Sequence, residues 1–335
     1  RLVELSGVAP LAPTFLTQPA NTAVLYGGTA QFNALPANGT PPLSYRWYYG
    51  GLPVFDDARI SGAGTTKLTI TNVGFTDAGS YQLRVLGPAG VTNSAPAQLT
   101  FIGPLQAQIN AAATGAVINL STGTYTETLV LDRNLTLNGQ WWNKPVLSGG
   151  HAGTVLHVLP GANVTVRGVA IRNGASSGNG GGVLNEGTLT LDHCLIADNS
   201  ASKGGGIANL KTLTVLQSVI SNNYALNAGG GLYTATGAVS AVTNSTFTEN
   251  LSDVGGGLAN LGTNTFVSSL LANNFASGMS GLGGGVHSSN GFVQLINATV
   301  SGNAASSVSG LSPTGSGGGI HASGGSLELH FSTVA

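Results

Sequence analysis

The sequence predicts an all-β protein in two parts, an antiparallel β-sandwich followed by a parallel β-helix with stacked coils. Hydrophobic residues make up 41% of the chain and charged residues only 7%, a composition that excludes disorder, while the 52 glycines disfavour a helical protein. Short alternating segments between turn residues fill the first third of the chain. From Gly180 onward a glycine triplet recurs at intervals that lengthen from 24 to 34 residues.

A chain of 335 residues is long enough to bury two cores. We expect residues 1–11 to be a linker or a donated strand, 12–102 to be the sandwich and 104–335 to be the β-helix. The net charge of -1, without a cluster of lysine and arginine, disfavours nucleic acid as a partner. No apolar run reaches the roughly 20 residues of a membrane span. Because the chain starts at Arg1 without a signal-like segment, we expect the mature or excised part of a secreted protein.

The first part follows the pattern of a sandwich core. Phe32 and Ala34 alternate inward, and Trp47 is expected to be the core aromatic of a third strand. Tyr81 precedes the inward Leu83 by two residues, which is the arrangement of a tyrosine corner. These features resemble the I-set-like immunoglobulin domains of bacterial surface proteins. The resemblance implies that Ala34 and Leu83 occupy the two cysteine positions, so apolar packing replaces the disulfide.

The second part repeats the same columns of residues in each coil. One apolar column contains Leu191, Val215, Val242, Phe266, Leu295 and Leu329. Another contains Ile196, Ile220, Phe247, Leu271, Val300 and Val334. The small-residue column between them contains Cys194, Ser218, Ser245, Ser269, Ala298 and Ser332. Cys194, the only cysteine, is therefore interpreted as a small buried member of this column, and a reactive thiol is the alternative.

Each coil of about 25 residues has room for three short strands, with about 4.8 Å between neighbouring coils. The glycine triplets predict a sharp bend that needs positive φ or has no room for a Cβ atom. Asparagines close the strand block at Asn199, Asn223, Asn250, Asn274 and Asn303. We expect them to adopt the left-handed conformation and to form a ladder of amide hydrogen bonds between coils. A short amphipathic helix at 105–113 is expected to cover the first coil.

The motif of three glycines, an apolar residue, any residue and an asparagine is intact at Val183, Ile207 and Leu258. It is weaker where Thr234, Ser288 and Ala322 replace the asparagine. This region is similar to the right-handed parallel β-helix repeats of bacterial secreted and surface proteins. That resemblance implies adhesive or structural work, and more distant β-helices include polysaccharide lyases and hydrolases.

Catalysis on this scaffold would need acids and bases that converge across neighbouring coils. Asp198 and Glu249 share one position, but Asn222 lies between them, which places the two carboxylates about 10 Å apart. His287 and His321 occupy one outward position about 5 Å apart, too few ligands for a metal site, and are interpreted as a solvated or interface pair. We therefore predict no enzyme activity, and no catalytic, cofactor-binding or metal-binding residues.

The sequence thus favours a non-catalytic extracellular or cell-surface protein, an adhesin or a filament subunit that associates end to end. A strand donated by Leu2–Leu5 would pair with the open edge of the final coil. The alternative is a carbohydrate-binding or polysaccharide-cleaving β-helix with a glycan or cell-surface partner held against Tyr233, Trp141 or Trp142. Segments 275–282 and 304–316, where the repeat lengthens, are expected to project as loops from one edge.

Overall fold

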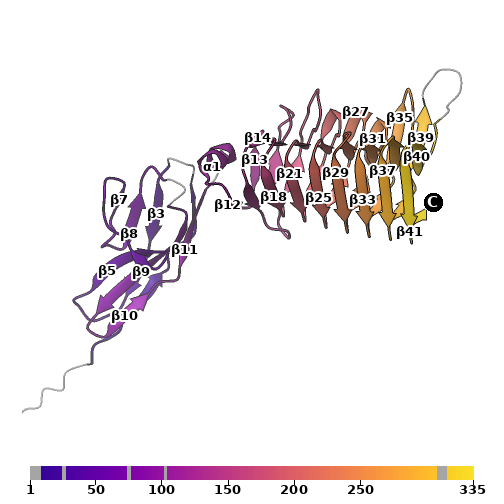
Figure 1. Ribbon diagram of the computed structural model, residues 1–335. Helices are drawn as coiled ribbons and strands as arrows, with labels where there is room; N and C mark the ends of the chain where they lie inside the picture. The colour runs from indigo at the N-terminus through magenta and orange to yellow at the C-terminus, as the bar shows by residue number, and fades with distance from the viewer. Residues whose placement is uncertain (1–8, 25–27, 74–76, 102–103, 308–314) are drawn as a thin grey trace, which may run out of the picture. The chain divides into compact units, whose positions relative to one another are not determined.

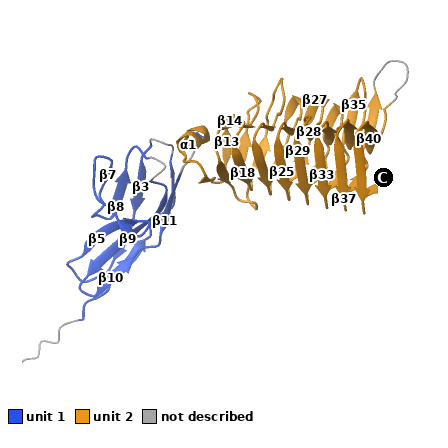
Figure 2. Ribbon diagram, in the orientation of Figure 1, with its two compact units in different colours: residues 1–104 blue, residues 105–335 orange. Residues whose placement is uncertain are grey.

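A computed structural model describes residues 9–24, 28–73, 77–101, 104–307 and 315–335. The chain divides into two compact units at Pro104 and Leu105 (Figures 1 and 2). The structure confirms the all-β class, because the described elements are strands apart from one helix. Residues 1–8, which make up most of the expected donated strand, lie outside the described part of the chain. Residues 308–314 of the second expected loop also lie outside it.

The first unit is an immunoglobulin-like sandwich. Its largest sheet contains β2 (Thr22–Val24), β11 (Ala97–Phe101), β9 (Gly79–Gly87), β5 (Ser44–Tyr49) and β6 (Leu52–Pro53), with β10 (Gly90–Asn93) on β9. A second sheet contains β3 (Ala30–Asn33), β8 (Lys67–Ile70) and β7 (Ile60–Ser61), and a small one pairs β1 (Thr14–Thr17) with β4 (Leu35–Ala37).

The core of this sandwich contains the predicted residues. Trp47 is fully buried, and its indole nitrogen donates a hydrogen bond to the Thr65 carbonyl at 3.0 Å. The Tyr81 hydroxyl donates to the Asp77 carbonyl at 2.8 Å, which confirms the tyrosine corner. Ala34 and Leu83 are both buried, so close apolar packing occupies the positions that the resemblance assigned to cysteines.

The second unit is a parallel β-solenoid in which every strand pairs with its counterpart in the next coil. Sheet one contains β12 (Ala116–Asn119), β15 (Leu135–Asn138), β18 (Asn163–Arg167), β21 (Thr188–Asp192), β25 (Thr212–Leu216), β29 (Val239–Thr243), β33 (Thr263–Val267), β37 (Phe292–Ile296) and β41 (Ser326–His330). Sheet two contains β13 (Thr124–Thr126), β16 (Val146–Ser148), β19 (Ala170–Arg172), β22 (Leu195–Ala197), β26 (Val219–Ser221), β30 (Thr246–Thr248), β34 (Leu270–Ala272), β38 (Thr299–Ser301) and β42 (Thr333–Val334).

Two further sheets complete the coils. Sheet three contains β14 (Leu129–Leu131), β17 (Leu156–Val158), β20 (Val183–Asn185), β24 (Ile207–Asn209), β28 (Leu232–Thr234), β32 (Leu258–Asn260), β36 (Val286–Ser289) and β40 (Ile320–Ser323). Sheet four contains β23 (Ser200–Lys203), β27 (Tyr224–Ala228), β31 (Leu251–Val254), β35 (Phe275–Gly278) and β39 (Ala304–Ser307).

Sheet four corrects two expectations from the sequence. Coils that include it have four strands instead of three. Segments 275–282 and 304–316 also do not begin as projecting loops, because β35 and β39 pair in register from Phe275 with Ala304 to Gly278 with Ser307. The reason is a small buried residue two positions after each ladder asparagine, such as Ala225 or Ala276, which lets the chain stay extended against the coil.

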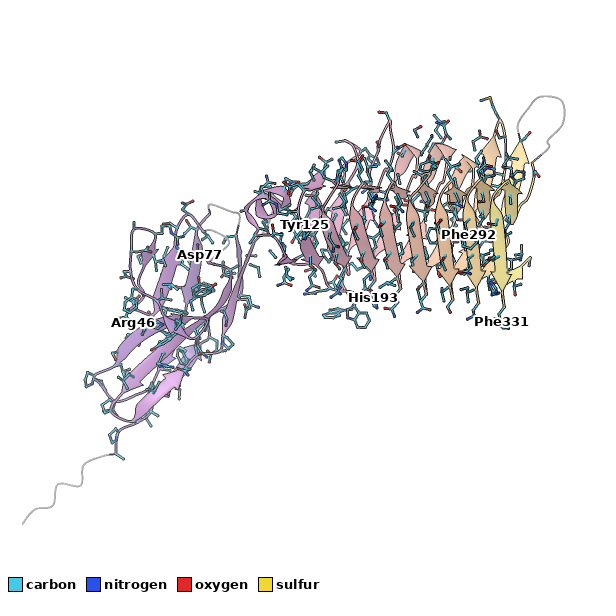
Figure 3. The ribbon with its side chains drawn as sticks, viewed as in Figure 1. Arg46, Asp77, Tyr125, His193, Phe292 and Phe331 are labelled. Carbon is cyan, nitrogen blue, oxygen red and sulfur yellow. The ribbon has the colours of Figure 1, made fainter. Side chains whose placement is uncertain are left out.

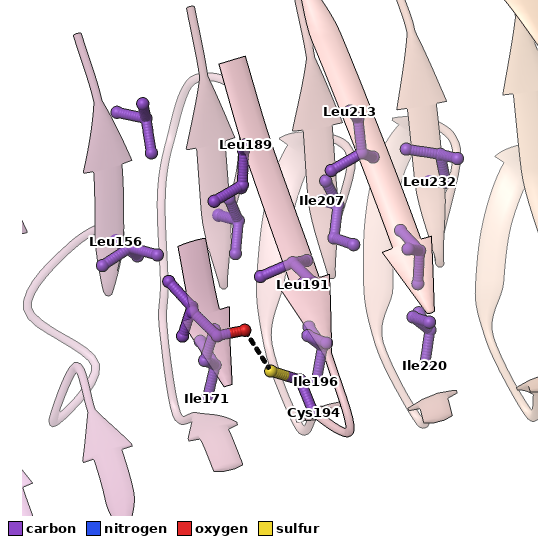
Figure 4. Close-up of a cluster of buried hydrophobic side chains, with 14 of the residues drawn as sticks. Leu156, Ile171, Leu189, Leu191, Cys194, Ile196, Ile207, Leu213, Ile220 and Leu232 are labelled. Atoms are coloured by element: carbon purple, nitrogen blue, oxygen red, sulfur yellow. Dashed lines mark hydrogen bonds between the residues drawn. The ribbon is translucent and has the colours of Figure 1, made fainter. Parts of the chain in front are cut away.

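The predicted apolar columns form the solenoid core. Leu191 pairs with Val215 in sheet one, and Ile196 pairs with Ile220 in sheet two. Figure 4 shows these side chains interleaved between the sheets, with Cys194 among them. In the small-residue column, the Ser218 and Ser245 side chains accept hydrogen bonds from the backbone of the preceding coil. The column is therefore a second ladder between coils.

The glycine triplets behave as predicted. The first glycine of each triplet has φ between 65° and 69°, a conformation that side chains disfavour. The second has no room for a Cβ atom, since one on Gly205 would collide with the Tyr224 carbonyl and lie 2.8 Å from the Gly230 oxygen. The triplet is therefore required both by conformation and by the approach of the next coil.

The asparagine prediction is half right. The amide of Asn199 donates to Asn223 at 3.0 Å, and the pattern repeats through Asn250 and Asn274 to Asn303. The left-handed conformation, however, belongs to the residue before each ladder asparagine, as at Asp198 with φ of 59°. This bend turns the chain so that the following asparagine side chain points inward, where its amide can reach two coils.

Where the asparagine of sheet three is replaced, polar residues of sheet one complete the network. Thr234 donates to Asn264 at 3.0 Å, and Asn264 donates to Asn260 at 2.6 Å. Asn209 donates to Ser240 at 2.9 Å. Ser240 and Asn264 occupy inward positions that are apolar in earlier coils, so the hydrogen bonds of this buried cluster are supplied by its neighbours.

The helix α1 (Leu105–Ala111) covers the first coil, as predicted. Leu105 and Ile109 are buried against the solenoid core. The Glu127 carboxylate accepts from the backbone N–H groups of Leu105 and Gln106 at 2.6 and 2.9 Å, which fixes the start of the helix. The Gln106 amide bonds both the N–H and the C=O of Val130, at 2.7 and 3.1 Å, and so occupies part of the open edge of β14. No helix in the described part of the chain is long and apolar enough to cross a membrane.

Candidate functional site

The two carboxylates considered for catalysis lie on the bend before the asparagine ladder. Asp198 and Glu249 both have positive φ, and Asn222 occupies the same position in the coil between them. Asp198 accepts from Arg172 at 2.7 Å and from Asn222 at 2.6 Å. These contacts use Asp198 in an ion pair and in a bridge between coils, instead of opposing it to a second carboxylate.

The two histidines stack on neighbouring coils of sheet three. Their rings lie 5.1 Å apart at an interplanar angle of 10°, and the Nδ1 atoms of His287 and His321 are 3.0 Å apart. Contrary to the expected solvated pair, the His287 side chain is buried, and burial lowers its pKa, with a further contribution from His321. Among the described residues no group of three or more metal-binding side chains converges here or elsewhere.

Cys194 is buried inside the solenoid. Its thiol donates to the Val166 carbonyl at 3.3 Å, and burial raises its pKa to about 11 (Figure 4). A neutral, buried thiol is a poor nucleophile, so this contact supports the interpretation of Cys194 as a packing residue.

One ion pair was not anticipated from the sequence. The Nε2 atom of His157 lies 2.7 Å from the Glu186 carboxylate, and both side chains are part-exposed on the outer face of sheet three. Their strands β17 and β20 are neighbours, which brings residues 29 positions apart together. The signal was available in the stacking register, but the register of these early coils lacks the glycine triplets that align the later ones.

The aromatic residues considered for glycan binding separate into two groups. Tyr233 is buried, packed between Ala208 and Ala259 with the Lys203 ammonium 5.3 Å from its ring, so it is not the exposed surface that the sequence suggested. Trp141 and Trp142 are 62% and 70% exposed. They lie on the loop between β15 and β16.

The corner between sheets one and two carries the most distinctive surface. The Trp141 ring packs edge-on to Trp142 at 5.6 Å and lies 6.1 Å from the His193 ring. Three coils along the same corner, at β29–β30, β33–β34 and β37–β38, form an open hollow of about 480 Å³. Its lining residues are Asn244, Ser245, Thr246, Ser268, Ser269, Leu270, Asn297 and Thr299. We call this surface, from Trp141 to Asn297, the aromatic-polar corner.

The immunoglobulin I-set domain family matches residues 13–101. Similar solved structures include titin domain M10 in a complex with obscurin-like 1, which is 31% identical over 28% of this chain and 97% of that chain, with a TM-score of 0.26. Titin domain M4 is 19% identical over 28% of this chain and 100% of that chain, with a TM-score of 0.26. The extracellular domains 3–5 of Drosophila OTK are 22% identical over 28% of this chain and 33% of that chain, again with a TM-score of 0.26. No curated protein matches the chain.

Proposed function

We propose that this chain is a non-catalytic, extracellular structural or adhesive protein, in which the solenoid is a stiff support for surface contacts. The observation that carries the proposal is the use of its polar residues. Buried amides and hydroxyls form continuous ladders from coil to coil, such as Asn199 to Asn303 and Ser218 to Ser269. Fully bonded networks of this kind rigidify a fold.

The charged residues support the same proposal. Arg172 pairs with Asp198, His157 with Glu186, and Asp192 contacts both Arg167 and His193. These pairs lie on different coils and act locally between adjacent strands. The I-set match at residues 13–101 adds a domain type suited to binding or spacing, although fold by itself does not assign a function.

The non-catalytic part is tested by incubating the intact chain with plant and microbial polysaccharides and measuring new reducing ends. We expect none above the level of heat-denatured protein. Sustained release of reducing ends by the native chain would overturn this part and favour the polysaccharide-cleaving alternative.

We propose further that end-to-end association covers the last coil. On that coil Leu329 is 48% exposed, Val334 is 44% exposed and Phe331 is 96% exposed. An apolar strand edge of this kind pairs readily with another strand, which can come from a second copy or from further polypeptide.

Sedimentation and electron microscopy of the chain at high concentration test this association. We expect end-to-end polymers that Leu329→Lys abolishes, whereas Leu226→Lys, an equally exposed change on β27, leaves them intact. Deleting residues 1–11 tests the donated strand specifically. A chain that stays monomeric at every concentration would contradict the association itself.

A further inference from the structure

The backbone of the aromatic-polar corner retains side chains where the conformation disfavours them. Its corner residues all have φ between 46° and 59°: Gly168, His193, Gln217, Asn244, Ser268, Asn297 and Phe331. Glycine, asparagine and aspartate accept this left-handed conformation best. The equivalent bend before the asparagine ladder uses mostly those types, at Asn173, Asp198, Asn222, Glu249, Asn273 and Gly302. Gln217, Ser268 and Phe331 therefore mark a corner where an outward side chain is kept despite backbone strain.

The corner presents these side chains as a regular array. Strand pairing fixes neighbouring coils about 4.8 Å apart, so His193, Gln217 and Asn244 follow one another at that spacing along the solenoid. Figure 3 shows His193 and Phe331 on the same edge of the solenoid, with ring systems projecting outward beside His193. The array thus runs from the tryptophan loop across Gln217 into the polar hollow.

The chemistry of the array changes along its length. At one end the exposed tryptophans offer flat apolar faces with an N–H donor at the edge. In the hollow, Asn244, Ser268 and Asn297 offer amide and hydroxyl groups that both donate and accept hydrogen bonds. Asn297 already donates to Ser268 at 3.2 Å, which holds one side of the hollow in place.

Charge around the corner argues against an ionic ligand. None of the residues lining the hollow is charged. At the aromatic end Asp192 contacts both His193 at 2.7 Å and Arg167 at 3.5 Å, and the Lys144 ammonium donates to the Trp141 carbonyl. A nucleic acid or an acidic polysaccharide would require unpaired cations along its path.

From these observations we propose that the aromatic-polar corner binds a neutral oligosaccharide that lies along the solenoid axis. Pyranose rings stack their C–H faces on Trp141 and Trp142, and the hydroxyl groups of following sugars bond the side chains of Asn244, Ser268 and Asn297. A linear sugar chain has a repeat length similar to the coil spacing and hydroxyls that match donors and acceptors together. This proposal rests on the adhesive function above and names its ligand class.

Tryptophan fluorescence of the intact chain tests the binding directly. The chain has three tryptophans, of which Trp47 is buried in the other unit, so a shift in emission on adding ligand reports the exposed pair. We would titrate cellohexaose, xylohexaose, mannohexaose and laminarihexaose, with oligogalacturonate as the anionic comparison. At least one neutral hexasaccharide is expected to bind with a blue shift, and oligogalacturonate is expected to bind more weakly.

Variants then locate the site. The double change Trp141→Ala with Trp142→Ala is expected to weaken binding by about tenfold or more, measured by calorimetry, and Asn244→Ala by a smaller factor. Tyr224→Ala, which removes an exposed aromatic from β27 on sheet four, is the matched control and should leave the affinity unchanged. Circular dichroism confirms that each variant is folded.

The outcomes separate this proposal from the proposed function. Absence of binding to every neutral hexasaccharide overturns the oligosaccharide site, and so does binding that the tryptophan variant leaves unchanged. Tighter binding of oligogalacturonate also overturns it. Reducing ends released from a bound hexasaccharide would instead contradict the non-catalytic function while leaving the binding site in place.

Discussion

Asn223 lies in the middle of the asparagine ladder and makes five hydrogen bonds with its side chain. Its amide donates to the Ile196 and Ser221 carbonyls and to Asn250, each at 3.0 Å, and its Oδ1 atom accepts from the backbone and side chain of Asn199. Asn223→Ala leaves several of these buried groups without a partner. We expect the free energy of unfolding of the solenoid to fall by about 3 kcal/mol, measured by urea denaturation.

A surface asparagine provides the comparison. Asn227 is exposed on sheet four and donates a single bond to Ser202. Asn227→Ala should change the free energy of unfolding by no more than about 0.5 kcal/mol. Equal losses for the two variants would mean that the ladder contributes no more than an ordinary surface contact.

Cys194 gives a prediction that depends on pH. Burial raises its pKa to about 11 in the folded chain, above the ordinary value of 9.0 for an exposed thiol. The unfolded chain therefore loses this proton first, so the stability contribution is complete below pH 9 and is lost as the pH rises toward 11.

Two measurements check the behaviour of Cys194. A thiol reagent at pH 8 should label the native chain only at the rate of unfolding, and denaturant should make labelling fast. The drop in stability between pH 9 and 11 should be smaller in Cys194→Ser, which places serine where the next coils already have Ser218 and Ser245. Rapid labelling of the folded chain would show that the thiol is accessible.

At the same scale, sequence reasoning found residues whose role repeats and missed those whose role depends on conformation. The ladder asparagines were visible because they recur at one position relative to the glycines. The left-handed bend was assigned to them wrongly, because Asp198, Asn222 and Glu249 beside them have no common side chain. Likewise nothing in the letters marks Gln217 as a left-handed residue, since its conformation follows from the corner between two sheets.

The helix α1 closes one end of the solenoid through polar contacts as well as apolar packing. Gln106→Ala removes both bonds to Val130, and Glu127→Ala removes the acceptor for the first two helical N–H groups. We expect each change to lower stability by about 1–2 kcal/mol. Hydrogen exchange of the Val130 amide should become faster by about tenfold or more in both variants.

The comparison for the helix is Gln294→Ala. Gln294 also lies on a strand and donates to Glu328, but it is on the outer face of sheet one far along the solenoid. Exchange at Val130 should not respond to this change. If Gln106→Ala leaves Val130 equally protected, the glutamine does not cover the edge of β14.

Elements were predictable where periodicity and burial agree. Sheets one and two follow from branched apolar residues at alternate positions, and α1 follows from its apolar face. Sheet four escaped notice because its inward residues are small, Ala201, Ala225, Ser252 and Ala276, and give no hydrophobic alternation. A strand whose buried side chains are methyl or hydroxymethyl groups has the composition of a loop.

For the molecule as a whole, the solenoid should behave as a stack of units that interact only with their neighbours. Deleting residues 204–228 removes one complete coil of 25 residues, from the start of one glycine triplet to the next. The new neighbours match in type, because Asn199 meets Asn250 and Cys194 meets Ser245. We expect a folded chain with one cooperative solenoid transition and a lower midpoint temperature, measured by circular dichroism.

The decisive comparison removes half a coil. Deleting residues 204–215 takes out fewer residues but joins segments from different sheets, so inward and outward positions no longer agree along the next strand. That variant should lose the solenoid transition while keeping the transition of the first unit, in which Trp47 has its own core. If the shorter deletion were tolerated better than the complete coil, stability would depend on the number of residues lost and not on register, and the stacked-column account of the fold would be wrong.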